Sequence, residues 1–200
     1  MSRKITVALM WTPDVDGTVD FKGACKEVEK VFPEKFDFRF IGTNGIIDDR
    51  RNAHEILRNG NLYMKRGEWT IDSSDAVSSF SAFCNNRISR SDYFIIFTGQ
   101  LMDFEKGESF EYHSSNIALI TLRDASTTFE RDNLAVFSIK HVLGHFLGVK
   151  EHCDNDMHTC VMSKKDRSNP TNGINYPLYN GALCYCDACS AKIRKAIEKY

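Results

Sequence analysis

The segment His141–Cys153, with the sequence HVLGHFLGVKEHC, completes the clearest helical pattern in this chain. Apolar residues recur at steps of three and four between Val136 and Phe146, which predicts a helix over Asn133–Leu147 with one core-facing stripe. Gly148 follows where the C-terminus of a helix favours a left-handed residue. We therefore expect a helix that ends within this segment and a chain that turns immediately after it.

Two histidines of this segment have the spacing of metal ligands. His141 and His145 are four residues apart, so a helix places both imidazoles on one face, where two nitrogens can bind one zinc at about 2.0–2.1 Å. After the turn, His152 or Glu151 can return as a third ligand, which leaves the fourth position open, as in catalytic zinc sites. The alternative is a chance pair of histidines buried by Phe and Leu neighbours.

The remaining pattern predicts an α/β fold built on a mixed, mainly parallel twisted sheet. The expected strands are Lys4–Met10, Phe36–Phe40, Tyr93–Phe97, Ser109–His113 and Ile117–Leu122, and the expected helices are Val19–Val31, Asp48–Leu57 and Ser74–Cys84. Strands that alternate with helices up to residue 147 favour parallel pairing. After that point the chain is irregular until a basic helix over Ala188–Tyr200. We expect an α/β part over 1–152 and a small irregular C-terminal zinc lobe over 153–200.

Cysteines are concentrated in the C-terminal lobe. Five of the seven lie between Cys153 and Cys189, although a reducing compartment disfavours a disulfide framework. Cys186 and Cys189 have the C-x-x-C spacing of a zinc knuckle, and Cys153 and Cys160 are the natural second pair. A closed Cys₄ site would supply folding free energy to a lobe too small to bury much of itself.

Other residues could replace a member of this set. Cys184 or His158 are the chief alternatives, and a disulfide is the redox alternative. Cys25 and Cys84 stand alone in the sequence and are expected to be small buried apolar residues.

Composition and charge exclude several classes of protein. The 26 basic and 27 acidic residues give a net charge of −1, so no overall field attracts this protein to nucleic acid or to a membrane surface. The apolar run Ile5–Trp11 is shorter than a signal-peptide core and far too short to span a bilayer. We expect a soluble cytoplasmic protein, and the sequence does not indicate an oligomeric state.

Taken together, the motifs resemble those of the archaemetzincins, a family of metzincin zinc metallopeptidases. The matching motifs are His141–Cys153, in which a His is followed at once by Cys, then Cys160-Val161-Met162 and the C-x-x-C pair. The resemblance covers residues about 92–189, and the first 90 residues match only in the rhythm of strands and helices. It implies a metzincin-like fold, two zinc ions per chain, and Met162 as the methionine of the Met-turn beneath the metal.

The sequence departs from the family pattern at the residues that matter most for chemistry. The family has Glu directly after the first His, where this chain has Val142. The place of the third His holds Glu151, and His152 comes one residue late; we expect His152 to bind, with Glu151 as the alternative. Six residues separate Cys153 from Cys160, more than in the family.

Val142 decides the expected activity. Valine cannot accept a proton, and general acid–base catalysis contributes about 10²–10⁴ in rate. We therefore expect a zinc-binding protein whose peptidase activity is lost or strongly attenuated and whose cleft binds a peptide or protein segment.

Two further hypotheses remain. The protein could be an active, aminopeptidase-like zinc peptidase that takes its base from elsewhere, such as Glu105, Glu108 or Glu111. Alternatively, only the cysteine lobe binds metal and the histidine helix holds none. A metzincin-like fold would also give Ser109–Tyr112 a role as the sheet edge along which an extended substrate lies.

Overall fold

The computed structural model describes residues 3–12, 14–41, 62–65, 68–72, 74, 76–78, 91–99, 101–104, 107–108, 111–123, 125–149, 160–163 and 184–200. The chain forms two compact units. The first comprises Met1–Ile5, Val19–Asp37 and Ala125–Tyr200, and the second comprises Thr6–Thr18 and Phe38–Asp124. The expected boundary after residue 152 lies outside the described residues and stays a prediction.

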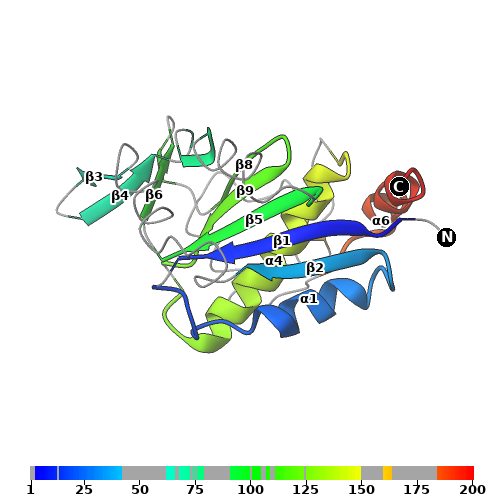
Figure 1. The fold of residues 1–200 in the computed structure, drawn as a ribbon, viewed down its shortest axis with the longest axis horizontal. Helices are drawn as coiled ribbons and strands as arrows, with labels where there is room; N and C mark the ends of the chain where they lie inside the picture. The colour runs from blue at the N-terminus through cyan, green and yellow to red at the C-terminus, as the bar shows by residue number, and fades with distance from the viewer. Residues whose placement is uncertain are drawn as a thin grey trace. The chain divides into compact units, whose positions relative to one another are not determined.

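A five-stranded sheet has the strand order β2-β1-β5-β9-β8 (Figure 1). Its strands are β1 (Ile5–Trp11), β2 (Phe36–Ile41), β5 (Tyr93–Thr98), β8 (Glu111–Ser114) and β9 (Ile117–Thr121). β5 pairs in parallel with β1 and with β9, whereas β8 pairs antiparallel with β9 at the edge. The expected α/β class and mainly parallel sheet are confirmed.

Burial explains why these strands could be located from sequence. All residues of β5 and β9 are buried, which matches the continuous apolar runs expected of strands covered on both faces. The alternating phenylalanines of β2 are buried to different extents. Phe36 is buried, but Phe38 is half-buried and Phe40 is 38% exposed, because β2 is an edge strand whose apolar face is not covered along its whole length.

A second sheet was not predicted. It has four strands in the order β3-β4-β6-β7, namely β3 (Leu62–Lys65), β4 (Glu68–Asp72), β6 (Leu101–Phe104) and β7 (Gly107–Glu108). Strands of two to five residues carry too few positions for a period to be recognised. Ser74 and residues 76–78 are helical, as expected for the start of Ser74–Cys84. The rest of that helix, and the expected helix Asp48–Leu57, lie outside the described residues.

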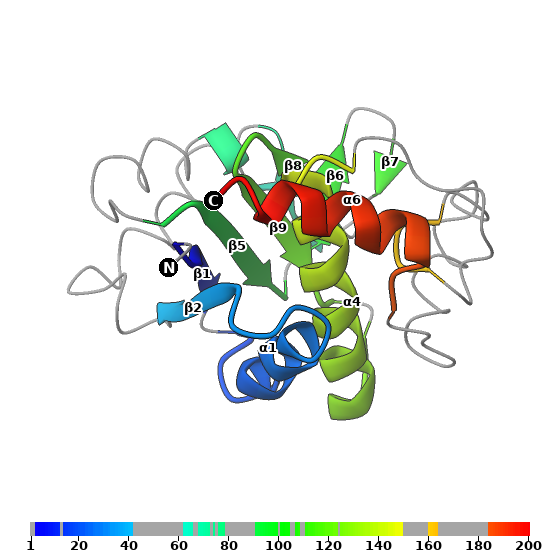
Figure 2. The same cartoon turned by 90° about the vertical axis from the view of Figure 1, so that its right-hand side faces the viewer.

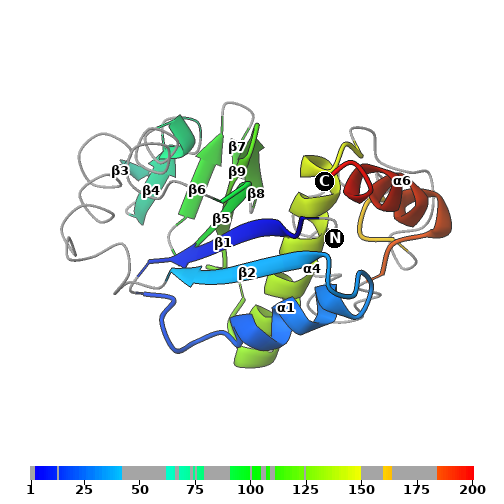
Figure 3. The same ribbon diagram turned by 45° about the vertical axis from the view of Figure 1, so that its right-hand side comes forward.

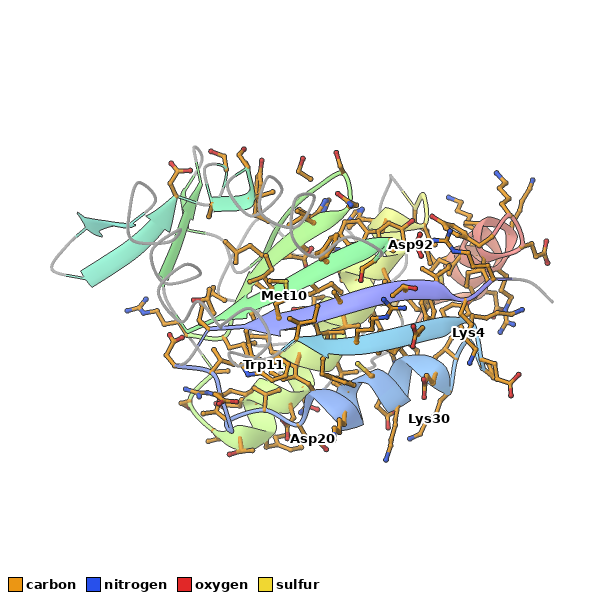
Figure 4. The ribbon with its side chains drawn as sticks, in the orientation of Figure 1. Lys4, Met10, Trp11, Asp20, Lys30 and Asp92 are labelled. Carbon is orange, nitrogen blue, oxygen red and sulfur yellow. The ribbon has the colours of Figure 1, made fainter. Side chains whose placement is uncertain are left out.

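In the first unit, helix α1 (Phe21–Glu29) packs against helix α4 (Thr128–Phe146), as Figure 3 shows. Asp20 caps α1, its carboxylate accepting a hydrogen bond from the amide of Gly23 at 2.8 Å. The amide of Asp20 also donates to Asp132 of α4 at 2.8 Å. Figure 4 marks the two ends of α1 with Asp20 and Lys30.

Helix α4 begins at Thr128, five residues before the expected Asn133, because a capping box precedes the apolar stripe. The Thr127 hydroxyl accepts from the amide of Glu130 at 3.2 Å, and the Glu130 carboxylate accepts from the amide of Thr127 at 2.9 Å. In the first turn, Phe129 is 68% exposed. The pattern of buried apolar residues therefore does not reveal this turn. At the other end, Gly148 has φ +89°, the left-handed conformation that the sequence predicts.

Within the part of the chain that the structure describes, no helix has both the length and the apolar character needed to span a bilayer.

We predict that Thr127→Ala lowers the free energy of unfolding by about 1 kcal/mol, because it removes the side-chain half of the capping box. Thr128→Ala, one residue further on and exposed, is the matched control and should change stability by less than about 0.5 kcal/mol. Urea denaturation of the two variants measures both values. Equal losses would contradict the role of the capping box.

Candidate metal centre

The two histidines of α4 meet at their ring nitrogens. Nε2 of His145 lies 3.2 Å from Nε2 of His141, with ring centroids 4.6 Å apart and ring planes at 88°. His141 is only 2% exposed and stacks on Phe137 one turn earlier, with centroids 5.6 Å apart, while His145 is half-buried. The i, i+4 spacing on α4 therefore brings the two Nε2 atoms together.

This separation suits a shared zinc ion. Two nitrogens bound at 2.0–2.1 Å in a tetrahedral arrangement lie about 3.3 Å from each other. The same separation also allows one ring to donate a hydrogen bond to the other. The structure thus brings together the two predicted ligands with an Nε2–Nε2 separation that matches a shared zinc ion.

Gly144 allows Met162 to approach the backbone of α4 closely. A Cβ atom at Gly144 would lie 2.5 Å from Sδ and 3.1 Å from Cε of Met162, so the methionine packs directly on the helix backbone. Gly144 lies between the two histidines in sequence, and Met162 is fully buried. Met162 thus lies against the histidine-bearing turn of α4, and its role as the methionine of a Met-turn stays a prediction. Sequence reasoning gave Gly144 no role, although a glycine inside a buried helix is itself a sign of close approach.

Val142 is fully buried on α4 next to His141. Its side chain contributes packing and offers no lone pair.

The predicted third ligand, His152 or its alternative Glu151, lies outside the described residues. Among the alternative bases, Glu111 lies on β8 in the other unit, and its side chain is 5% exposed with Oε1 4.0 Å from Nε2 of His113. The side chains of Glu105 and Glu108 are not described.

Three of the four predicted cysteine ligands form a cluster. The sulfur atoms of Cys160, Cys186 and Cys189 all lie within 4.8 Å of one another, a spacing that fits tetrahedral thiolate coordination with Zn–S bonds of about 2.3 Å. Cys160 and Cys189 are buried, and Cys186 is half-buried. Cys184, an alternative ligand, is exposed and does not join the cluster. Cys153 and His158 lie outside the described residues.

Local backbone structure positions these sulfurs. The amide of Val161 donates to the carbonyl of Cys184 at 2.8 Å, which joins the segment of the first cysteine to that of the other two. The amide of Met162 donates to Sγ of Cys160 at 3.4 Å, an interaction that favours the thiolate form required for metal binding.

Helix α6 (Asp187–Ile197) supplies the other two cysteines. It begins one residue before the expected Ala188 and ends before the expected Tyr200. Cys186 is its N-cap residue and Cys189 lies in its first turn, where the positive end of the helix dipole also favours thiolates.

Tyr185 joins the cysteine cluster to the histidine helix. Its hydroxyl donates a hydrogen bond to the backbone carbonyl of Lys140, the residue before His141. α6 lies beside the C-terminal end of α4 in Figure 2 and Figure 3. Burial raises the pKa of Tyr185 well above its usual value, so the phenol keeps the proton it donates. Burial likewise lowers the pKa of Lys140.

Cys25 takes no part in either group. It is buried on α1, as expected of a lone cysteine, and burial together with nearby Glu29 and Asp20 raises the pKa of its thiol. None of the five cysteines in the described segments forms a disulfide.

Comparison with known proteins identifies the fold. No protein-family model matches this chain, and no curated protein sequence matches it significantly. Its structure is similar to the crystal structure of archaemetzincin from Methanopyrus kandleri, with a TM-score of 0.65 over 98% of this chain and 96% of that chain, at 12% sequence identity. An identity this low shows the fold alone. The archaemetzincin-like fold that the motifs implied is therefore confirmed.

We predict that Gly144→Ala destabilises the protein by about 1–3 kcal/mol, because the new methyl group overlaps the buried end of Met162. Met162→Ala alone also destabilises, through the cavity it leaves. In the double variant the clash disappears, so the two losses should sum to more than the loss observed. Denaturant unfolding of the three variants gives the coupling, and strict additivity would show that Met162 does not pack on Gly144.

Proposed function

We propose that this chain is a metallopeptidase-like protein that binds two zinc ions. The first ligand set is His141, His145 and His152, with Glu151 as the alternative third ligand, and the second is Cys153, Cys160, Cys186 and Cys189. The convergence of the two imidazole nitrogens at 3.2 Å, on the long helix of an archaemetzincin-like fold, is the observation that carries the proposal. The cysteine cluster supports the second zinc independently.

The proposed activity is binding of a peptide or protein segment with little or no hydrolysis. A zinc ion with an open position lowers the pKa of bound water towards about 7 and polarises a carbonyl group. The residues beside it must then accept and return a proton, and Val142 cannot do so. β8 supports a peptide as the partner, because it is an edge strand of its sheet and an edge strand can pair with an extended chain.

The second candidate is an active, aminopeptidase-like zinc peptidase with a base from elsewhere in the chain. The candidate bases are Glu105, Glu108 and Glu111. Under either proposal we expect the protein to be cytoplasmic.

Metal analysis tests the ligand sets. We predict two zinc ions per chain in the wild type and one in His145→Ala with the fold retained. Cys189→Ala should lose the other ion and weaken the packing of α6, because thiolate–zinc bonds contribute directly to folding. His113→Ala and Cys25→Ala, which alter the same residue types outside both ligand sets, should keep two ions. One ion that survives His145→Ala would show that the histidine helix binds no zinc.

Peptide cleavage tests the role of Val142. We predict that Val142→Glu cleaves peptides about 10²–10⁴ times faster than the wild type, because it supplies a proton acceptor beside the metal. Val142→Gln is the matched control, since it has the same size without the base, and should stay slow. Zinc content and circular dichroism confirm that both variants are folded. Rapid zinc-dependent cleavage by the wild type would overturn the first proposal in favour of the second.

A further inference from the structure

We propose that Tyr185 is a positioning residue that couples the two metal sites, so that metal at the cysteine cluster fixes the turn of α4 carrying His141 and His145. This inference rests on the proposed function, because the coupling can change metal affinity only if the histidine site binds a metal ion. It assigns a role to a residue outside both ligand sets.

The first coupling contact is the hydrogen bond from Tyr185 to the carbonyl of Lys140. Tyr185 directly precedes Cys186, and Lys140 directly precedes His141. In an α-helix the carbonyl of Lys140 also accepts the amide of Gly144, four residues on. The phenol therefore anchors the helical turn from Lys140 to Gly144, which contains His141 and directly precedes His145.

The second contact with this turn comes from Met162, in the segment that carries Cys160. Met162, two residues after Cys160, packs against Gly144 with no room for a Cβ atom between them. The Met162 amide itself donates to the Cys160 sulfur. Two cysteine-bearing segments thus contact one turn of α4. The contacting residues, Tyr185 and Met162, each lie within two residues of a cysteine.

The positions of the two cysteine-bearing segments depend on the interactions that keep their sulfur atoms close together. The two segments share the backbone hydrogen bond from Val161 to Cys184, and thiolates that converge within 4.8 Å repel one another unless a cation binds them. Binding a metal in such a cluster is equivalent to folding the segments that carry it. Metal at the cysteines therefore positions Tyr185 and Met162, and these position the histidines.

Replacement of Tyr185 by phenylalanine isolates the hydroxyl group. The ring is 8% exposed and packs on Phe32 at 5.7 Å between centroids, so Tyr185→Phe retains the packing and removes one donor. The Lys140 carbonyl keeps its partner within the helix. Tyr200→Phe, at the exposed C-terminal residue, is the matched control for loss of a phenol.

The experiment titrates the metal-free full chain with Co²⁺ and has two readouts. A thiolate-to-cobalt charge-transfer band reports filling of the cysteine cluster. Hydrogen exchange of the amides of Leu143–Leu147, before and after the first equivalent, reports order in the histidine-bearing turn. The dissociation constant of the second equivalent reports the histidine site.

In the wild type and in Tyr200→Phe, we expect the first equivalent to slow exchange in Leu143–Leu147. In Tyr185→Phe we expect the same charge-transfer band, loss of most of that protection, and second-ion binding weaker by roughly 10-fold, a typical size for coupling between sites. Wild-type behaviour of Tyr185→Phe in both readouts would overturn the proposal. Loss of its charge-transfer band would also do so, because Tyr185 would then belong to the cysteine site itself.

The two proposals fail in different ways. If no second ion binds either protein while protection still depends on Tyr185, the histidine zinc site is wrong and the coupling to the helix stands. If the second ion binds both proteins equally and the first changes no exchange rate, the coupling is wrong and the histidine site stands.

Discussion

The last two turns of α4 are held from outside by segments that converge on Cys160, Cys186 and Cys189. The phenol of Tyr185 bonds to the carbonyl before His141, and the side chain of Met162 lies on the bare backbone of Gly144. Both contacts lie at the part of α4 where Nε2 of His141 and Nε2 of His145 are 3.2 Å apart, and neither contact involves a histidine ring. The candidate metal site therefore combines a local feature, the i, i+4 spacing of its histidines, with nonlocal packing from the cysteine-bearing segments.

Val142 separates what the fold requires from what hydrolysis requires. Its side chain is fully buried on α4, so an apolar residue satisfies the packing there. Helix α4, its apolar stripe and its histidine pair are all present with valine at this position. The similarity to archaemetzincin at 12% identity concerns the fold, whereas activity resides in the site, so the two can vary independently.

Local sequence signals predicted the parts of the structure that local physics determines. Strands β1, β5 and β9 correspond to continuous apolar runs, and α4 corresponds to a periodic apolar pattern. Gly148 marks the end of this helix. The capping box was also visible, as Thr127 and Glu130 at the T-x-x-E spacing, but it lies outside the apolar stripe. The second sheet has strands too short to show a period. Tyr185 was missed because its partner is 45 residues away and no local rule joins a phenol to a distant carbonyl.

Zinc K-edge X-ray absorption of the wild-type protein, loaded to saturation and freed of loosely bound metal, tests the central claim most directly. Two zinc ions in different ligand sets predict two populations of bonds, sulfur at about 2.3 Å and nitrogen or oxygen at about 2.0–2.1 Å, with the multiple scattering that imidazole rings produce. A spectrum explained by sulfur alone would show that the histidines of α4 meet without a metal, and it would contradict the account given for this helix.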